Sequence, residues 1–590
     1  MEQYVIIREK HLAAYFKLKK TCEFISSLRL GVSIILIIFI FYLFKKHSII
    51  LDLLFILTMI FFIVLILIHQ KLLRKTQISK TLIDVNNDEI LFLKKEGLPF
   101  KNGLEYYDPQ HPYSFDLDFF IDNGLFQNLN RTATYIGSQK LASLLLTKLS
   151  NEKIKLNQDA IKELTSKISW RQDLFALARL SRDSREVYDN LEKWSENSYN
   201  KASKYLHIIS YVLPGLFILS VILYWILQNI TFIYVSCVIF AINSLIFVLL
   251  LKRMKQETIE ADKVHEIIEK YKLIIEIIEK EEFFSTILQV LKSNLIHKES
   301  LASTQINKLS ILFHNMDSLQ NGLGSFLLNG MILYHIHMFQ KLLNWKKDCS
   351  SSIMVWLETI GEFETLNSFA NFSFNNPEFT FPVFNNDFEI TLNELGHPLI
   401  EKNKRICNTI QFNTNNFIIL TGSNMSGKST FLKTLGINMV LACIGSPICS
   451  SYANIHPLDV VVSMQISDSL IESKSYFLAE LKRLKTIMNS LDKKVCFVLL
   501  DEILRGTNSD DKRVGTIEVI KKLIIKNAIG AIATHDIDVC KTKDDYPHKL
   551  VNKCFEVQIV NKNLLFDYIL RDGICKNKSA SILMNQMGII

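Results

Sequence analysis

The stretch TGSNMSGKST, from Thr421 to Thr430, fits the pattern G-x-x-x-x-G-K-[ST], and its fixed positions are Gly422, Gly427, Lys428 and Ser429. The apolar run NNFIIL before it is typical of a strand, and FLKTLGINMVLAC after it is typical of a helix. In such a setting the glycines let backbone N–H groups surround phosphate oxygens, and the helix N-terminus adds partial positive charge. The stretch therefore predicts an α/β domain with a phosphate-binding loop.

ATP and Mg²⁺ are the cofactors that this loop predicts. We expect Lys428 to reach the β- and γ-phosphates and the Ser429 hydroxyl to coordinate the metal. A bare match of this kind can arise by chance, and the strand–loop–helix setting argues against chance here. The predicted nucleotide-binding residues of the loop are Gly422, Ser423, Asn424, Met425, Ser426, Gly427, Lys428, Ser429 and Thr430.

Three further candidates follow two more apolar runs. KVCFVLLDE reads as a strand that ends in Asp501 and Glu502. We expect Asp501 to hold the metal through water and Glu502 to orient and deprotonate the attacking water. The alternative is a surface acidic pair, but the position behind a phosphate-binding loop favours the metal site. His535 follows the strand in NAIGAIATHD and suits a catalytic role in sensing the γ-phosphate, although a lone histidine is more often structural.

Length and composition indicate several domains and local apolar concentrations. The chain has 590 residues, 49% of them hydrophobic, and a mean hydropathy of +0.18. The net charge of +8 suits an anionic membrane face or nucleic acid and requires neither. Ten cysteines form no C-x-x-C pair, which disfavours a disulfide framework or a zinc site. The N-terminus lacks the pattern of a secretory signal, so we expect it to be retained.

Four apolar runs form two pairs, and we predict two transmembrane helical hairpins from them. Three runs reach the ~20 residues that span a hydrocarbon core, and the first is short unless Phe24–Arg29 adds a turn. Buried hairpins of a soluble protein are the alternative, against which run length and the scarcity of polar residues argue. The runs are Leu30–Phe44, Ile49–Ile68, Leu206–Leu227 and Ile230–Leu251.

Flanking charges predict which side of the membrane holds the soluble segments. Lysine and arginine precede and follow both hairpins, and four crossings keep every large segment on one side, which should be the cytoplasm. Lys45 and Lys46 in the first turn are contrary evidence but are outnumbered. Beyond the fourth run, apolar residues from Ile259 to Ile278 recur at three- and four-residue steps, which predicts an amphipathic helix continuing out of that span.

Several motifs together resemble the MutS family of mismatch-repair ATPases. TGSNMSGKST is similar to that family's TGPNMGGKST and departs from it at Ser423 and Ser426. DEILRGT at 501–507 resembles DEIGRGT, and ATHD at 533–536 matches the ATH switch. DSLIESKSYFLAE at 468–480 is similar to DDLASGRSTFMVE. This likeness implies that Ser475 contacts the nucleotide of the partner subunit, although Ser473 and Lys474 replace the family's glycine and arginine.

The resemblance extends less strongly outside the last 200 residues. HPLI at 397–400 looks like the opening of the family's ATPase domain, the segment 116–146 resembles the entry to its core domain, and Arg171 and Gln172 match its RQ helix. The family's mismatch-reading domain, with its Phe-x-Glu wedge, has no counterpart before Ser114. Mismatch recognition is therefore not carried over to any residue of this chain.

The predicted fold is α plus α/β, with two transmembrane hairpins, a MutS-like helical core and a C-terminal ABC-type P-loop NTPase domain. Its segments are a cytoplasmic N-terminus at 1–28, hairpin 1 at 29–70, a first helical segment of the MutS-like core at 71–203, hairpin 2 at 204–252, a helical lever or second core segment at 253–384, and the ATPase domain at 385–590.

The resemblance implies a homodimeric ATPase, and the apolar hairpins predict that it is anchored in membrane lipid. Our leading hypothesis is a membrane-anchored MutS-like ATPase coupled to double-stranded DNA, in a role like mismatch repair or recombination. Two alternatives stay open. One is an ATP-driven membrane machine that acts on a protein or lipid partner without DNA, and the other is a nucleotide-gated scaffold with negligible turnover.

Overall fold

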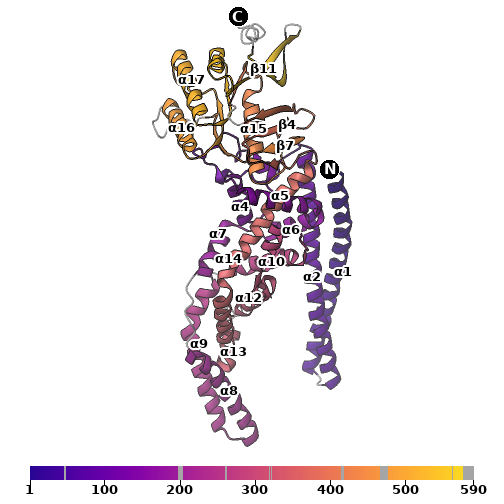
Figure 1. Ribbon diagram of the computed structural model, residues 1–590. Helices are drawn as coiled ribbons and strands as arrows, with labels where there is room; N and C mark the ends of the chain where they lie inside the picture. The colour runs from indigo at the N-terminus through magenta and orange to yellow at the C-terminus, as the bar shows by residue number, and fades with distance from the viewer. Residues whose placement is uncertain are drawn as a thin grey trace.

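The computed structural model describes residues 1–45, 48–181, 183–196, 204–259, 262–317, 319, 322–413, 417–465, 476–560 and 563–575. It confirms the mixed helical and α/β architecture that the sequence predicts. The α/β domain lies at one end of the molecule, a helical core lies below it, and two long helical legs extend away from the core (Figure 1). Both legs point away from the α/β domain.

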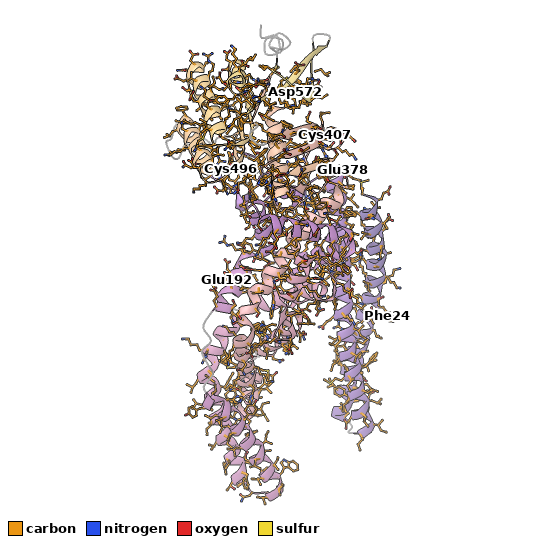
Figure 2. The ribbon with its side chains drawn as sticks, in the orientation of Figure 1. Phe24, Glu192, Glu378, Cys407, Cys496 and Asp572 are labelled. Carbon is orange, nitrogen blue, oxygen red and sulfur yellow. The ribbon has the colours of Figure 1, made fainter. Side chains whose placement is uncertain are left out.

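The first leg is the hairpin of α1 (Glu2–Lys45) and α2 (Ile49–Leu93), which pack along their length. Both helices are longer than the apolar runs because polar and amphipathic sequence continues their helical pattern toward the core. Near the core α2 packs against α6 (Ile168–Ser181). Along the apolar section side chains stand out from the leg, and Phe24 at its start is also exposed (Figure 2).

The second leg contains α8 (Lys204–Leu227) and α9 (Thr231–Ile259), which form the second hairpin. The short helix α13 (Gly322–Ile332) packs against both of them. Within the described residues, α1, α2, α8 and α9 are the four helices long and apolar enough to cross a membrane by length and composition. The sequence predicted to continue α9 forms α10 (Asp262–Lys280), and the junction at 260–261, where a continuous helix would be seen, lies outside the described residues.

The helical core is built around α14 (Tyr334–Asn375), whose large buried side chains include Trp356, Phe363 and Phe369. Helices α4, α5, α7 and α12 pack against it. The remaining elements of the core are η1 (Leu104–Tyr106), α3 (Leu125–Leu129), α4 (Tyr135–Leu145), α5 (Asn151–Ser166), α7 (Arg185–Glu196), α11 (Thr286–Ser293), α12 (Ala302–Asp317) and the strand pair β1 (Ile296–His297) and β2 (Ser300–Leu301).

The α/β domain contains a six-stranded sheet in the order β12-β11-β6-β10-β9-β8, and only β12 runs antiparallel to its neighbour. The sequence predicts three of these strands, and they are confirmed to within one residue, because each is a short apolar run buried on both faces. The strands are β6 (Phe417–Gly422), β8 (Asp459–Ser463), β9 (Cys496–Asp501), β10 (Ile529–Thr534), β11 (Leu550–Val560) and β12 (Asn563–Asp572).

A second sheet of the same domain has the order β3-β7-β4-β5. Its strands are β3 (Val383–Phe384), β4 (Ile390–Leu395), β5 (Asn408–Phe412) and β7 (Tyr452–Ile455). The helices of the domain are α15 (Lys428–Cys443), α16 (Tyr476–Leu491), α17 (Ser509–Ile525), η4 (Ile537–Lys541) and α18 (Thr542–Asp545).

The core and the α/β domain are joined by polar contacts beneath α15. Asp116 accepts hydrogen bonds from the backbone N–H groups of Met464 and Gln465 and pairs with Arg483 at 2.9 Å. Asp118 forms an ion pair with Lys433 of α15. The Asp118–Lys433 pair connects the helix that begins at Lys428 directly to the core, and the contacts of Asp116 connect the end of β8 and α16 to it.

Candidate functional site

The predicted site residues meet at one edge of the six-stranded sheet. Strand β10 lies between β6 and β9 and is parallel to both, so that Thr534 pairs with Thr421 and Ala533 pairs with Asp501. The carboxyl ends of parallel strands lie at the same edge, where ligands of open α/β sheets bind. The loop after β6, the acidic pair after β9 and His535 after β10 are thereby brought together.

The loop between β6 and α15 ends in a left-handed turn at Gly427, whose φ is +98°. A Cβ atom at Gly427 would lie 2.9 Å from the ring of Tyr568, so glycine is required there by both conformation and space. Lys428 follows as the first residue of α15 and is 6% exposed. Its Nζ donates to the carbonyl oxygens of Gly422 at 2.9 Å and of Ser423 at 3.0 Å.

The electrostatic setting of Lys428 combines burial with nearby acids. Burial lowers the pKa of the Lys428 amine, and the carboxylates of Glu502 and Asp501 act in the opposite direction. Two loop hydroxyls are buried as well. The Oγ atoms of Ser423 and Ser426 have no hydrogen-bond partner within the described segments of the chain. Buried polar groups without partners are costly, so the loop has donors ready for an oxygen-rich ligand.

The two predicted metal-binding residues are in direct contact. Ser429 Oγ donates to Asp501 Oδ2 at 2.5 Å, which joins the first turn of α15 to the end of β9. Burial raises the pKa of the Asp501 carboxyl, and the bond from Ser429 opposes that rise. A hydroxyl beside a carboxylate is an oxygen donor set of the kind that Mg²⁺ prefers.

Glu502 and His535 form a second pair at the same edge. His535 Nδ1 lies 3.4 Å from Glu502 Oε1. The backbone of Glu502 is left-handed, with φ of +48°, and its N–H donates to the carbonyl of Ala533 at 3.0 Å. Burial acts to raise the pKa of Glu502, but His535, Arg505 and Lys428 lower it below its usual value. Glu502 is therefore held as a carboxylate.

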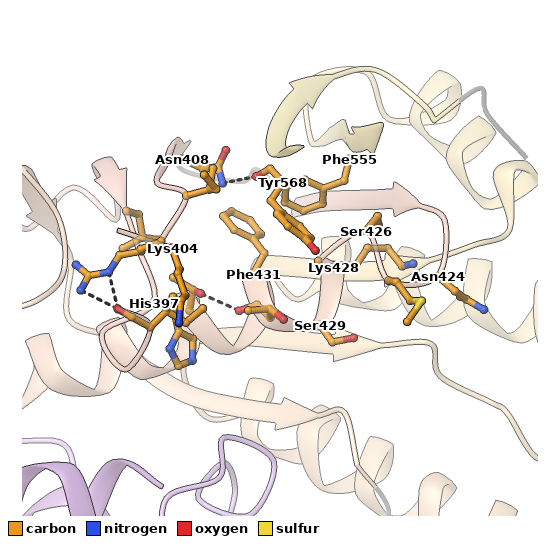
Figure 3. Close-up of a pocket in the computed structure, with 18 of the residues that line it drawn as sticks. His397, Lys404, Asn408, Asn424, Ser426, Lys428, Ser429, Phe431, Phe555 and Tyr568 are labelled. Carbon is orange, nitrogen blue, oxygen red and sulfur yellow. Dashed lines mark hydrogen bonds between the residues drawn. The ribbon is translucent and has the colours of Figure 1, made fainter. Parts of the chain in front are cut away.

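A cavity of about 550 Å³ opens in front of the loop, and Asn424, Ser426, Lys428 and Ser429 line one side of it (Figure 3). Met425, Gly427, Thr430 and Glu502 also line it. Its volume lies in the range of small-molecule sites. His535 and Asp501 lie at the same sheet edge but do not line this cavity.

Two aromatic residues from distant strands line the cavity and were not predicted from the sequence. Phe555 of β11 and Tyr568 of β12 form a wall close to the loop, with the ring of Tyr568 against Gly427 (Figure 3). Asn408 holds this wall in place, because its Nδ2 donates to the Tyr568 carbonyl at 3.0 Å and its Oδ1 accepts from the Leu570 N–H at 2.7 Å. No local pattern around Tyr568 resembles a binding motif, and only the pairing of distant strands brings it to the loop.

Glu480 of α16 is a further residue that sequence reasoning did not single out for a role. Its side chain is 2% exposed and accepts the backbone N–H groups of Leu504 and Arg505. It thereby fixes the turn directly after Glu502. Ser475, which was predicted to reach across to a partner subunit, lies outside the described residues.

The donor set at this edge fits a nucleoside triphosphate with Mg²⁺. The loop offers a buried amine, two hydroxyls that have no partner among the described residues, and the first turn of a 16-residue helix, and all of these attract anionic oxygens. The Ser429–Asp501 pair lies beside them and supplies oxygen atoms for a cation.

Comparison with known proteins relates the C-terminal third of the chain to one family. MutS domain V matches residues 418–589. The DNA mismatch repair protein MutS of Ehrlichia ruminantium (strain Welgevonden) is 30% identical over 277 residues, which are 46% of this chain and 34% of that protein. MutS protein homolog 4 of Homo sapiens is 30% identical over 263 residues, which are 42% of this chain and 26% of that protein.

A third relative, the DNA mismatch repair protein MutS of Thermotoga maritima, is 30% identical over 200 residues, which are 33% of this chain and 25% of that protein. The chain thus spans about a third or less of the length of these three curated relatives.

Proposed function

We propose that this chain, whose residues 418–589 match MutS domain V, is a MutS-family protein that binds and hydrolyses ATP as a dimer while anchored in a membrane. The observation that carries the proposal is the contact between Ser429 and Asp501 beside the buried amine of Lys428. These three groups come from two segments that lie far apart in the sequence, and they match the needs of a metal-bound triphosphate.

Each residue of the site has a role that its surroundings support. Lys428 supplies positive charge to phosphate oxygens, and the hydroxyls of Ser423 and Ser426 donate to them. Ser429 and Asp501 would hold Mg²⁺, which when bound neutralises charge on the phosphates. Glu502, kept ionised by its neighbours, accepts the proton of the attacking water.

His535 orients Glu502 through their contact at 3.4 Å, and its proposed role in sensing the γ-phosphate acts through Glu502, which does line the cavity. Thr430, Asn424 and Met425 complete the loop. The proposed dimer would complete each site with Ser475 of the second copy, a proposal that rests on the family resemblance alone.

Membrane anchoring is supported by the direction and surface of the two legs. Their turns lie at the end of the molecule farthest from the α/β domain (Figure 1). Large apolar side chains such as Ile50, Leu57, Tyr211 and Leu249 are exposed along them. A patch of this size is unusual for a soluble monomer, and one bilayer can receive both legs with every soluble segment on its cytoplasmic side.

The ATPase cycle is proposed to be coupled to double-stranded DNA, in a role related to mismatch repair or recombination. The support is the function that the names of the relatives state, since two of them are DNA mismatch repair proteins. A membrane machine that acts on a protein or lipid partner without DNA is the alternative, which the two-legged shape favours.

The test is ATP hydrolysis by the full chain purified in detergent, measured without DNA, with linear duplex and with branched DNA. We expect Lys428→Ala to abolish nucleotide binding and DNA to stimulate turnover, with binding that weakens as salt rises. Lys493→Ala, at an exposed position in the turn after α16, is the control for loss of a lysine. If no DNA changed the rate of ATP hydrolysis and the protein showed no salt-dependent binding of DNA, the alternative would be favoured. Failure to bind ATP would refute the proposal.

A further inference from the structure

Helix α13 is apolar and lies beside the second leg, away from the α/β domain (Figure 1). It reads GLGSFLLNGMI, and no Asp, Glu, Lys, Arg or His occurs from Ser318 to Tyr334. The ring of Phe326 packs edge-on against Phe240 of α9, with centroids 5.6 Å apart. A Cβ atom at Gly330 would lie 2.2 Å from the same Phe240 ring, so α13 is in close contact with α9.

The contact with Phe240 sets the depth of α13 along the second hairpin. Phe240 precedes Leu251, the end of the apolar run, by eleven residues (251 minus 240), which is about 16 Å of helix. That distance is about half of a ~30 Å hydrocarbon core. With 11 residues α13 is itself about 16 Å long, too short to cross a bilayer. It is long enough to lie within one leaflet.

The face of α13 that turns away from α9 is covered by large apolar side chains. Leu323 is 76% exposed, which is similar to Leu249 at 72% on the lipid-exposed section of α9. Exposure of such an apolar cluster to water is unfavourable. Lipid acyl chains can cover it, because apolar side chains have no hydrogen bonds to lose on leaving water. The exposed members are Leu323, Leu327, Leu328, Met331 and Ile332, and Phe326 is partly exposed beside its contact with Phe240.

Buried side chains satisfy the backbone where α13 ends and α14 begins. The break is at Leu333, whose φ is +51°. Asn329 Oδ1 accepts the His335 N–H at 2.9 Å, and Asn329 Nδ2 donates to the Ser325 carbonyl at 2.7 Å. Asn243 of α9 donates through Nδ2 to the Gly330 carbonyl at 2.9 Å. Irregular backbone at membrane depth requires such internal partners.

The geometry points to α13 as a re-entrant helix that inserts into the leaflet nearer the α/β domain and is covered by lipid acyl chains. This inference rests on the proposed membrane anchoring and extends it, because the sequence assigned residues 253–384 to a helical lever outside the membrane. Lipid is favoured over a second copy of the chain because α13 continues the exposed apolar surface of α8 and α9.

Spin labels on the full chain in phosphatidylcholine–phosphatidylglycerol vesicles test the inference. The exposed Cys237 and Cys407 are first replaced by alanine. Labels are then placed singly in Leu323→Cys and Leu327→Cys, with Leu249→Cys as the lipid reference and Ile525→Cys of α17 as the water reference. Two α13 sites are used so that the second still gives a result if one variant misfolds. Retained ATP binding shows that each variant is folded.

We expect both α13 labels to show an oxygen-to-nickel accessibility ratio severalfold above that of the Ile525 site and comparable with that of the Leu249 site. If the accessibility ratio at both α13 sites matched the Ile525 site while the ratio at Leu249 was that of lipid, the re-entrant helix would be overturned and the membrane anchoring would stand. Water-like values at Leu249 would overturn the anchoring and the inference with it. If the α13 labels were protected from both oxygen and nickel and showed dipolar broadening, the lipid contact would be overturned in favour of a contact between two copies of the chain.

Discussion

At the scale of single residues, the proposed chemistry depends most on Glu502. Its left-handed backbone and the bond from its N–H to the Ala533 carbonyl direct the side chain toward His535. A left-handed conformation at a residue other than glycine is uncommon and often marks a functional position. Glu480 supports this geometry from outside the cavity through the two N–H groups that it accepts.

We expect Glu502→Gln to reduce ATP turnover by about 10²-fold or more while nucleotide binding is kept, because an amide cannot accept the proton of water. The measurement is single-turnover hydrolysis together with equilibrium binding of labelled ATP. Glu518→Gln on the exposed face of α17 serves as the control and should leave both unchanged. Equal turnover in Glu502→Gln and the parent would remove Glu502 from its role.

A second carboxyl has a pKa that makes stability depend on pH. Glu364 of α14 is completely buried and accepts the N–H of Ala133 at 2.8 Å and the hydroxyl of Thr134 at the start of α4. Burial raises the pKa of Glu364 from 4.5 to about 7, against the effect of these hydrogen bonds. Between these two pH values the folded protein binds more protons than the unfolded chain.

The free energy of unfolding should therefore fall as pH rises from 5 to 8, by up to about 3 kcal/mol from this group. Glu364→Gln removes that pH-dependent contribution. The free energy of unfolding of the variant, minus that of the parent, should therefore be more positive at pH 8 than at pH 5. Unfolding midpoints in detergent at both pH values give the answer, with Glu362→Gln on the exposed side of the same helix as the control. A variant-to-parent difference that is the same at both pH values would contradict the assignment.

At the scale of elements, the first leg is fixed to the core by a buried polar cluster. Glu89 of α2 pairs with Arg131, and both side chains are almost fully buried. Asn371 of α14 donates to Glu89 at 3.0 Å and accepts from Arg171 at 2.9 Å. Tyr4 of α1 donates to Asn371 at 3.1 Å, so both helices of the leg are connected to α14.

We expect Glu89→Ala to destabilise the protein by roughly 3–5 kcal/mol, because it leaves the Arg131 charge buried without its partner. Glu96→Ala removes the exposed pair with Lys94 at 3.9 Å and should cost no more than about 1 kcal/mol. Thermal unfolding in detergent compares the two. The double variant Glu89→Leu with Arg131→Met should recover only part of the loss, because no charge is left unpaired but Asn371 still lacks its acceptor. Similar effects of the two single variants would argue against a structural role for the buried pair.

Most elements near the site could be predicted from the sequence, because the signals are local. The loop before Lys428 has a fixed spacing, and its flanking strand is an apolar run. The same holds for the strands that end at Asp501 and before His535. The four long apolar helices were predictable for a different reason, since each contains an apolar run of about the length that crosses a hydrocarbon core.

The unpredicted features arise from contacts between distant segments. Tyr568 reaches the loop only because β11 pairs with β6 and β12 pairs with β11. Glu480 gains its role from the turn at Leu504, which lies on another element. Helix α13 was not singled out because eleven apolar residues are too few for a span and are equally typical of a core helix. Only the contact of α13 with Phe240, inside the apolar run of α9, distinguishes a helix within the membrane from a core helix.

At the scale of the whole molecule, α14 links the two ends of the structure. It is a single helix of 42 residues, about 63 Å long. Its first residues lie beside α9, where His335 approaches the ring of Phe247. Its last turns lie beside Glu89 at the base of the first leg, below the α/β domain. A movement of the α/β domain therefore has a direct route to both legs through this one helix.

This linkage predicts that nucleotide changes the separation of the two legs. Spin labels in Ile50→Cys and Trp225→Cys, both exposed near the leg turns, report that distance in a background with Cys237→Ala and Cys407→Ala. Excess unlabelled protein suppresses distances between two copies of a dimer. We expect the pulsed-EPR distance distribution to shift when Glu502→Gln is held with ATP and Mg²⁺, and to stay unchanged in Lys428→Ala. Superimposable distributions with and without ATP, in protein that still binds the nucleotide, would show that the legs anchor the ATPase without responding to it.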